Sequence, residues 1–189
     1  RITRILRERA RETLEQLERE QRLGIVLLGR PYHADRGLNH GVPDALQEMG
    51  LPVFTAETLP DDPDTLARVF GDEDARTVRD VWPNPFSENS SRKMWAAKYA
   101  ARHPNLLAVE LSNFKCGHDA PTYSLVRAIF EAAGKPLFSF LDLDENTPQN
   151  TLNIRIETIR HFLEEWCRAH GYQFTRSIQE EAPCLQNVS

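Results

Sequence analysis

The sequence predicts an α/β fold, a three-layer doubly wound domain of about four mainly parallel strands in the order 2-1-3-4, with an N-terminal amphipathic helix. Four short apolar runs, each beginning at or beside a glycine or proline, predict strands, and the first of them, GIVLLG, is typical of a strand buried on both faces. Helical segments separate these runs, and this alternation implies right-handed crossovers and a parallel sheet. The 189 residues, 40% of them hydrophobic, suffice for one packed core.

The first 22 residues are expected to form an amphipathic helix. Apolar residues recur at roughly helical spacing between arginines and glutamates, namely Ile2, Ile5, Leu6, Leu14 and Leu17. A stripe this narrow is typical of a helix that packs on its own domain or connects it to a preceding one. A coiled-coil dimerisation helix is the alternative, although the stripe breaks around residues 9–11.

The remaining elements alternate along the chain. Strands are expected at residues 24–29, 51–56, 105–111 and 136–141. Helices are expected at residues 43–49, 65–70, 91–102, 121–133 and 152–170. Pro43 suits a first helical turn, and Gly50 and Gly134 suit helix stops. We therefore expect a connector helix over 1–22, a single α/β domain over 23–170 and an irregular tail over 171–189.

Composition argues against several classes of function. The 23 basic and 28 acidic residues give a formal net charge of −5, which is unlike a strongly basic nucleic-acid-binding protein. No apolar run approaches the ~20 residues that span a membrane, and the arginine-rich N-terminus lacks the apolar core of a secretory signal. Because the chain starts within a predicted helix and without methionine, we expect it to be part of a larger protein.

The cysteines are few and scattered. Cys116, Cys167 and Cys184 lie far apart, which excludes a disulfide scaffold and any CxxC metal site contained in this chain. This usage suits a reducing cytoplasm, where we expect the protein to reside. Cys167 in the last predicted helix and Cys184 in the tail are expected to be structurally incidental.

Two unusual loops follow the first and third strands. They are residues 29–41, with the sequence GRPYHADRGLNHG, and residues 112–121, with the sequence SNFKCGHDAP. In an open α/β sheet, ligands bind beyond the carboxyl ends of the strands where the strand order reverses. With the order 2-1-3-4 that point lies between the first and third strands, so we expect the two loops to face one another across a crevice.

Cys116 is the first candidate for chemistry in these loops. It lies between Lys115 and His118 near a helix start, a setting that stabilises a thiolate. An inert loop cysteine, a nucleophilic or redox thiol, and a metal or cluster ligand all remain open. One cysteine cannot complete a metal site, so any partners would come from other residues or another chain segment.

The histidines and glycines of the loops give weaker signals. His33, His40 and His118 could be ligands or acid–base groups, but His33 and His40 are seven residues apart, which is not a zinc spacing. A hydrogen-bonding role that holds the loop is the simpler interpretation. The first loop matches neither GxGxxG nor the Walker A pattern, so a nucleotide-phosphate site is poorly supported there. Residues 87–93 suit helix capping, with an anion site as the alternative.

Four segments carry a family resemblance. They are GRPYHADRGLNHGVP, VWPNPFSENSSRKMWAAKYAARHPNL, LSNFKCGHDAPTYSLV and FSFLDLDENTPQNTLNIRIETI. Together they resemble the C-terminal, dehydratase-like region of the fused CoA-substrate-specific enzyme activase proteins, which is similar to 2-hydroxyacyl-CoA dehydratase and benzoyl-CoA reductase subunits. The resemblance covers about residues 23–168, and SNFKCGHDAP is its most specific part.

The resemblance implies a role in electron transfer. Dehydratase-like subunits are built from Rossmann-like lobes that hold an iron–sulfur cluster through cysteines of separate lobes, and their activases use ATP hydrolysis to drive a low-potential electron into it. It implies that Cys116 ligates iron, that Lys115, His118 and Asp119 tune the cluster or orient its loop, and that His33, Asn39 and His40 line the facing side of the crevice. The other cysteines of a complete site and the phosphate-binding motifs of the ATPase portion are missing here.

The predicted function is therefore a lobe that contributes to a shared iron–sulfur cluster site in ATP-driven electron transfer to CoA thioesters. Its partners would be other domains of the parent chain and a CoA thioester, with neither nucleic acid nor a membrane, and the isolated chain is expected to be inactive. Two alternatives remain open: a non-catalytic assembly domain of the larger protein, and a flavodoxin-like module that binds a small molecule.

Overall fold

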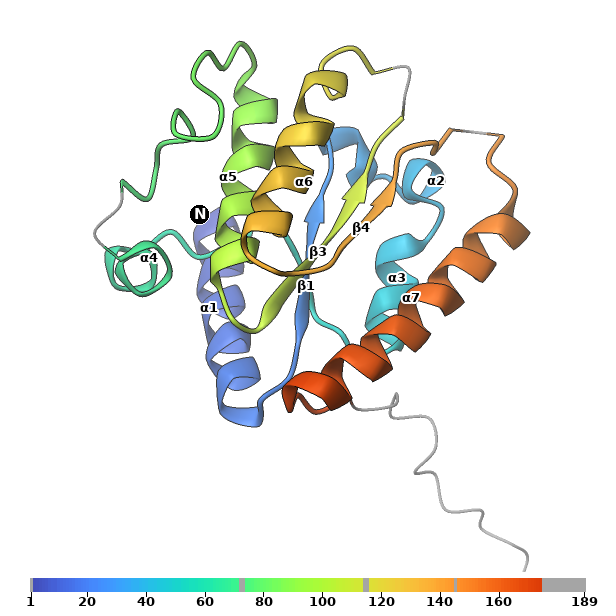
Figure 1. The fold of residues 1–189 in the computed structure, drawn as a ribbon, viewed down its shortest axis with the longest axis horizontal. Coiled ribbons are helices and arrows are strands. Elements are labelled where there is room, and N and C mark those ends of the chain that lie inside the picture. The colour runs from blue at the N-terminus through green and yellow to red at the C-terminus, as the bar shows by residue number, and fades with distance from the viewer. Residues whose placement is uncertain (1, 72–73, 114–115, 145, 175–189) are drawn as a thin grey trace, which may run out of the picture.

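Four parallel strands form the central layer of the molecule. The computed structural model describes residues 2–71, 74–113, 116–144 and 146–174. The strands are β1 (Gly24–Leu28), β2 (Val53–Thr55), β3 (Leu106–Leu111) and β4 (Leu137–Phe140). They pair in the order β2-β1-β3-β4, all parallel (Figure 1). The doubly wound α/β fold and the strand order predicted from the sequence are confirmed.

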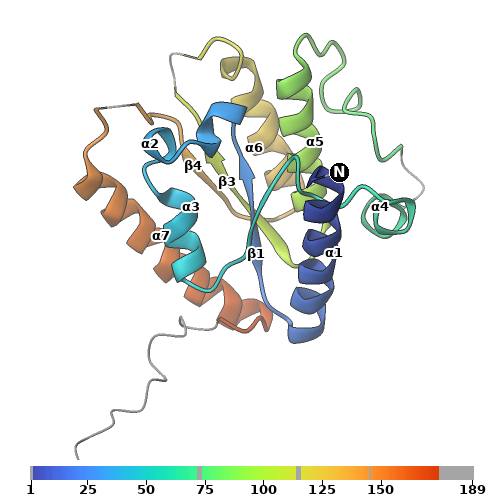
Figure 2. The same cartoon turned by 180° about the vertical axis from the view of Figure 1, so that it is seen from behind.

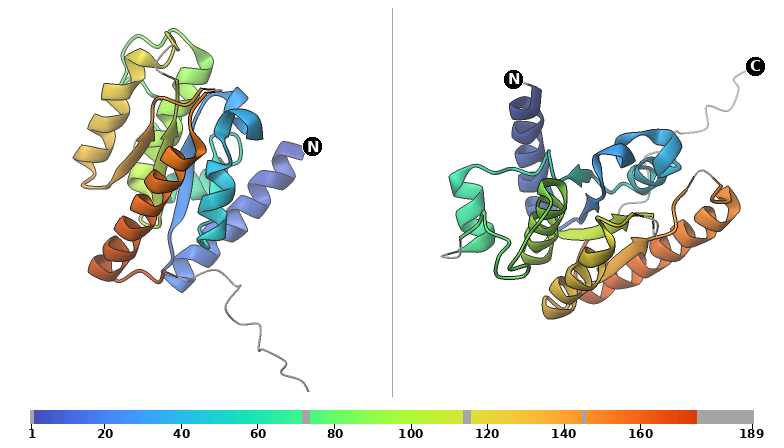
Figure 3. Two further views of the ribbon diagram at one scale, coloured as in Figure 1. Left: turned by 90° about the vertical axis from the view of Figure 1, so that its right-hand side faces the viewer. Right: turned by 90° about the horizontal axis from the view of Figure 1, so that it is seen from above.

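Helices cover both faces of this sheet (Figures 1, 2 and 3). The first face carries α1 (Ile2–Glu20), α4 (Pro63–Phe70), α5 (Glu88–Arg102) and α6 (Tyr123–Ala132). The second face carries α3 (Val42–Glu48) and α7 (Gln149–His170). Two hydrophobic cores therefore lie on opposite sides of one sheet.

The side chains of β1 alternate between the two cores. Val26 and Leu28 pack with the first-face helices, whereas Ile25 and Leu27 pack with the second-face helices. Every residue of β1 and β3 is buried, because each of these strands has a neighbour on both edges and helices on both faces. This double burial explains why the sequences of β1 and β3 are almost entirely apolar.

The N-terminal helix packs on the domain. Ala10, Leu14 and Leu17 of α1 join the first core, and Asn105 Nδ2 at the start of β3 donates to the Leu17 carbonyl at 3.2 Å. The apolar residues of its first turns remain exposed, namely Ile2, Ile5 and Leu6. This packing matches the own-domain interpretation of the stripe. Among the described residues, no helix has the length and apolarity that crossing a membrane requires.

The helices differ from the expected ranges mainly at their ends. α5 begins at Glu88 rather than at residue 91, because the side chain of Ser87 accepts a hydrogen bond from Ser90 N and caps the helix. Two four-residue helices, η1 (Pro31–Ala34) and α2 (Arg36–Asn39), occupy the first loop, which was expected to be irregular. They carry no apolar periodicity, and local bonds such as Gly37 N to Asp35 Oδ1 hold them.

Candidate functional site

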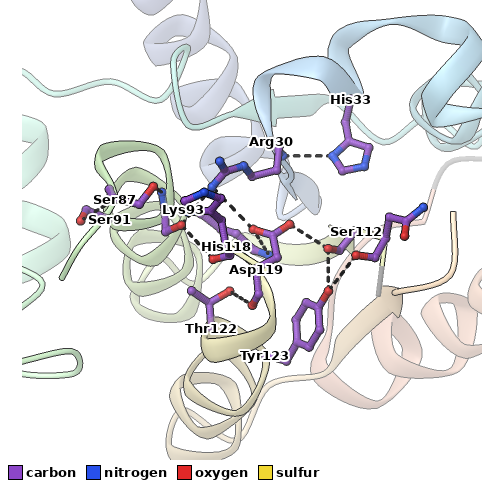
Figure 4. A network of polar contacts seen from close by, with 12 residues as sticks. Arg30, His33, Ser87, Ser91, Lys93, Ser112, His118, Asp119, Thr122 and Tyr123 are labelled. Carbon is purple, nitrogen blue, oxygen red and sulfur yellow. Dashed lines mark hydrogen bonds and ion pairs between the residues drawn. The ribbon is translucent and has the colours of Figure 1, made fainter. Parts of the chain in front are cut away.

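The two loops that follow β1 and β3 meet at the carboxyl edge of the sheet, as the strand order predicts. The Arg30 guanidinium, directly after β1, reaches across to Asp119 in the loop after β3, and it donates to Ser90 Oγ of α5 at 3.0 Å (Figure 4). Ser90 Oγ in turn donates to the His118 carbonyl at 3.1 Å. Side chains from three separate segments therefore hold the loops together.

A buried ionic cluster, formed by Arg30, Lys93, Glu110 and Asp119, lies beneath these loops. Lys93 Nζ is 2.8 Å from Glu110 Oε1 and 3.7 Å from Asp119 Oδ1. Arg30 Nη1 is 3.9 Å from Asp119 Oδ1. The side chains of Lys93, Glu110 and Asp119 are at most 2% exposed. Two positive and two negative groups balance, which is what allows four charges to be buried together.

Ion contacts rather than hydrogen bonds join the members of this cluster. Its four buried atoms Arg30 Nε, Lys93 Nζ, Glu110 Oε1 and Asp119 Oδ1 have no hydrogen-bond partner of good geometry in the described chain. The remaining carboxylate oxygens are better satisfied. Glu110 Oε2 accepts from Ser139 Oγ of β4 at 3.3 Å. The cluster thereby ties β1, β3, β4 and α5 together at one edge of the sheet.

Asp119 anchors the loop that contains Cys116. Its Oδ2 accepts from Ser112 Oγ at 2.7 Å, and its backbone carbonyl accepts from Thr122 Oγ1 at 2.7 Å. The Tyr123 hydroxyl lies 2.8 Å from Ser112 Oγ (Figure 4). The buried carboxylate of Asp119 therefore holds the start of the loop through Ser112, and its backbone carbonyl holds the end of the loop through Thr122.

Cys116 sits in a tight turn within that loop, with its side chain partly exposed. Its N–H donates to the Asn113 carbonyl at 2.8 Å, and its own carbonyl accepts from Asp119 N and Ala120 N. Tyr32, in the first loop, lies across from it: burial and the interaction with the Cys116 thiol raise the pKa of Tyr32. The structure thus brings the two loops together at this cysteine. Lys115 lies outside the described residues.

His33 is a buried, neutral imidazole beside the ionic cluster. It is 2% exposed, and burial lowers its pKa to about 4, although the nearby Asp119 carboxylate acts in the opposite direction. Its Nδ1 accepts from Arg30 N at 3.0 Å, so the ring proton resides on Nε2. The ring packs against Gly29, where an added Cβ would lie only 3.0 Å from Nδ1.

The other predicted residues of the first loop hold its shape. Asn39 donates to the His33 carbonyl at 2.9 Å and accepts from Gly41 N at 2.9 Å. His40 has a φ of 52°, and its Nε2 lies 2.8 Å from the Asp144 carbonyl in the loop after β4. The side chain of His118 is exposed, with its ring centroid 6.0 Å from that of Phe86. His33 and Asp119 thus lie at the ionic cluster. Asn39 forms its hydrogen bonds inside the first loop, and His40 contacts the loop after β4.

A cavity lies next to Arg30 and His33 of the first loop. It has a volume of about 350 Å³ and is formed by the carboxyl ends of β1 and β2, with Arg30, His33 and Thr55 among its lining residues.

In the described parts of the chain, no group of three or more His, Cys, Asp or Glu residues is arranged to hold a metal ion. Cys167 is buried in α7, where burial raises its pKa to about 11, and Cys184 lies outside the described residues.

Sequence reasoning missed most of the ionic cluster. Glu110 is a charged residue in the otherwise apolar run NLLAVEL, and such a residue in a doubly buried strand needs a buried partner. Lys93 was considered only as part of a polar helix start. Its position directly before Met94, at the spacing of the buried residues Ala97 and Ala100, was the available signal.

Comparison with known families supports the resemblance seen in the sequence. Residues 1–59 match the model of a family described as the CoA enzyme activase uncharacterised domain (DUF2229). The match spans α1, β1, the first loop, α3 and β2, and over this stretch it agrees with the resemblance to the CoA-substrate-specific enzyme activases. No curated protein and no solved structure matches the chain.

Proposed function

We propose that this chain is one lobe of a larger protein related to the CoA-substrate-specific enzyme activases and 2-hydroxyacyl-CoA dehydratases. In that protein it contributes a ligand to an iron–sulfur cluster that serves ATP-driven, low-potential electron transfer to CoA thioesters. The observation that carries the proposal is the position of Cys116, a partly exposed thiol held in a fixed turn at the switch point of the sheet, in a chain whose first 59 residues match an activase-associated domain.

Cys116 would supply one ligand of such a cluster. Cysteine thiolates are the usual ligands of iron–sulfur clusters, and Cys116 is the accessible thiol at this edge, whereas Cys167 is enclosed in the second core. Because one thiolate cannot hold a cluster, the remaining ligands have to come from other domains of the parent chain. When bound, the cluster supplies one-electron chemistry at low potential.

The residues around Cys116 would keep the sulfur in place. Asp119 fixes the loop through Ser112 and Thr122, and the ionic cluster fixes Asp119 in turn. Tyr32, in the opposite loop, is near enough to Cys116 for this residue to raise the pKa of the tyrosine. Buried, oriented groups of this kind control the geometry and electrostatic surroundings of a metal ligand. We assign Lys115 and His118 to the same supporting role by their place in the loop.

The test is anaerobic reconstitution of the full-length protein with iron and sulfide, comparing the wild type with Cys116→Ser. The account expects less iron per chain and a weaker cluster absorbance in the variant. Cys167→Ser is the matched control, because this buried thiol lies in another core and should leave the iron content unchanged. If Cys116→Ser retains the wild-type iron content, the ligand role fails and an assembly domain becomes the better description of the chain.

A further inference from the structure

A second cavity, away from Cys116, is lined by arginines. It has a volume of about 310 Å³, at the small end of the ~300–1,000 Å³ typical of ligand pockets. Its lining residues come from α1, α4, the first turns of α5 and the segments that contain Asp61 and Arg76. Its basic lining residues are Arg7, Arg76 and Arg92. Leu66, Val78 and Trp95 supply an apolar part of the wall.

Three arginines and two carboxylates line this arginine cavity, and the carboxylate of Glu57 lies just outside the lining. Asp61 and Glu88 are its acidic lining residues, and each has an arginine partner: Arg7 pairs with Asp61, and Arg92 Nη2 lies 3.1 Å from Glu88 Oε1. Arg92 Nη1 is also 3.9 Å from Glu57. These pairs use only part of the five donors that each guanidinium carries, so Arg7 and Arg92 are oriented but still able to donate.

Arg76 has no partner for its guanidinium among the residues that the structure describes. Its segment is nevertheless fixed on both sides. Trp95 Nε1 donates to the Ala75 carbonyl at 2.8 Å, and the buried Lys98 donates to the Thr77 carbonyl at 3.1 Å and pairs with Asp80. An exposed guanidinium with no partner in the described part of the chain therefore lies at the wall of the cavity, on a segment whose backbone is held on both sides.

A second hollow adjoins the first. It has a volume of about 510 Å³, shares Arg7 and Asp61 with the arginine cavity, and continues along α1 past Arg4 and Arg11. The ligand thus has room to extend beyond its charged group. The first turn of α5 also contributes lining residues, and negative charge is favoured at that end of a helix.

We propose that the arginine cavity binds the diphosphate group of a nucleotide, with Arg76 as the free cation and Arg7 and Arg92 as pre-oriented donors. Guanidinium groups match phosphate oxygens in a planar, two-point geometry, and the neighbouring hollow along α1 has room for the rest of the molecule. This inference adds a nucleotide-binding site to the proposed function, and its failure can be distinguished from failure of the Cys116 assignment, because neither Cys116 nor an iron–sulfur cluster takes part in it.

The probes are inorganic pyrophosphate and ADP, titrated into the 189-residue chain by calorimetry at low ionic strength, with the indole ¹H–¹⁵N signals followed in parallel. We expect both probes to bind and to shift the signal of Trp95, identified with Trp95→Phe, while that of Trp166 on the opposite face stays in place. Equal affinities assign the site to the diphosphate group alone, and tighter binding of ADP adds a contribution from the rest of the nucleotide.

Arg76→Ala supplies the decisive comparison. We expect it to weaken binding of both probes about tenfold, equivalent to about 1.4 kcal/mol, because it removes one charge-assisted contact. Arg79→Ala is the matched control, since Arg79 is an exposed arginine of the same segment outside the cavity lining, and it should leave the affinity nearly unchanged. Absence of binding by both probes, or equal losses in the two arginine variants, would overturn the proposal.

Discussion

Lys93 Nζ of α5 lies 2.8 Å from Glu110 Oε1 of β3, and both side chains are almost completely withdrawn from water. This contact joins a helix to the strand that precedes the Cys116 loop. Asp119 and Arg30 extend it to both loops at the carboxyl edge. The geometry of the candidate site therefore depends on a balance of buried charge that no surface residue can restore.

Breaking this ion pair from one side should strongly destabilise the fold. Lys93→Met leaves Glu110 and Asp119 buried with Arg30 as the remaining cation of the cluster, and we expect a loss of about 3–5 kcal/mol of unfolding free energy. The double variant Lys93→Met/Glu110→Leu should lose much less, because it removes both charges. Urea denaturation monitored by circular dichroism measures both, and a double variant as unstable as Lys93→Met would contradict this account.

Ser112 and Tyr123 should act together in holding the Cys116 loop. Their oxygens are 2.8 Å apart, and Ser112 Oγ also donates to Asp119. In a double-mutant cycle, Ser112→Ala and Tyr123→Phe should show a coupling energy of about 0.5–3 kcal/mol. Hydrogen exchange at residues 116–119 should accelerate in either variant. Additive effects with unchanged exchange would show that the two hydroxyls do not restrain this loop.

Gly29 should tolerate no side chain, because the His33 ring packs against it. An added Cβ would lie 3.0 Å from Nδ1 and 3.2 Å from Cβ of His33, and relief requires movement of a buried ring. We expect Gly29→Ala to destabilise the protein by about 1–3 kcal/mol. Gly117→Ala is the control, since an added Cβ there meets nothing within 4 Å. Equal melting temperatures for the two variants would refute the packing argument.

Two buried histidines should make the fold sensitive to mild acid. Burial lowers the pKa of His33 and of His103 from 6.5 to about 4. In each ring Nδ1 accepts a backbone N–H, from Arg30 and from Asn105, so an added proton would face another donor. Between pH 6.5 and about 4, these two histidines are protonated in the unfolded chain but remain neutral in the folded chain. Stability is therefore complete above pH 6.5 and is lost as the pH falls through this window, by up to about 3 kcal/mol per histidine.

Denaturation curves at pH 7.5 and 4.5 test this acid sensitivity. His103→Asn should reduce the difference in unfolding free energy between the two pH values, whereas the exposed His161→Asn should not. An unchanged pH dependence in His103→Asn would mean that this ring is protonated in the folded protein.

The fold could be predicted because its strands carry a strong one-dimensional signal. The run around Val26 is apolar throughout, and the run around Val109 is interrupted only by Glu110. Strands that alternate with helices also restrict the strand order to few possibilities. The place where the loops after β1 and β3 meet followed from that order. The Lys93–Glu110 pair could not be predicted, because it joins residues of different elements whose separation depends on tertiary packing. The proximity of Tyr32 and Cys116, which belong to different loops, has the same origin.

The short helices of the first loop escaped prediction for a different reason. η1 and α2 have four residues each, and a segment this short cannot show the periodic spacing of apolar residues that predicts a helix. Their stability comes from single bonds, such as the one from Asn39 to the His33 carbonyl. The spacing of the histidines in this loop favoured a hydrogen-bonding role over zinc binding. Only the structure, however, places His33 beside the ionic cluster.

The most direct test of the central claim is electron paramagnetic resonance of the reduced, reconstituted full-length protein. If Cys116 ligates iron, Cys116→Ser should change the g-values or remove the signal, and Cys167→Ser should preserve the wild-type spectrum. A Cys116→Ser protein whose reduced spectrum and intensity match those of the wild type would contradict the assignment of Cys116 as a cluster ligand.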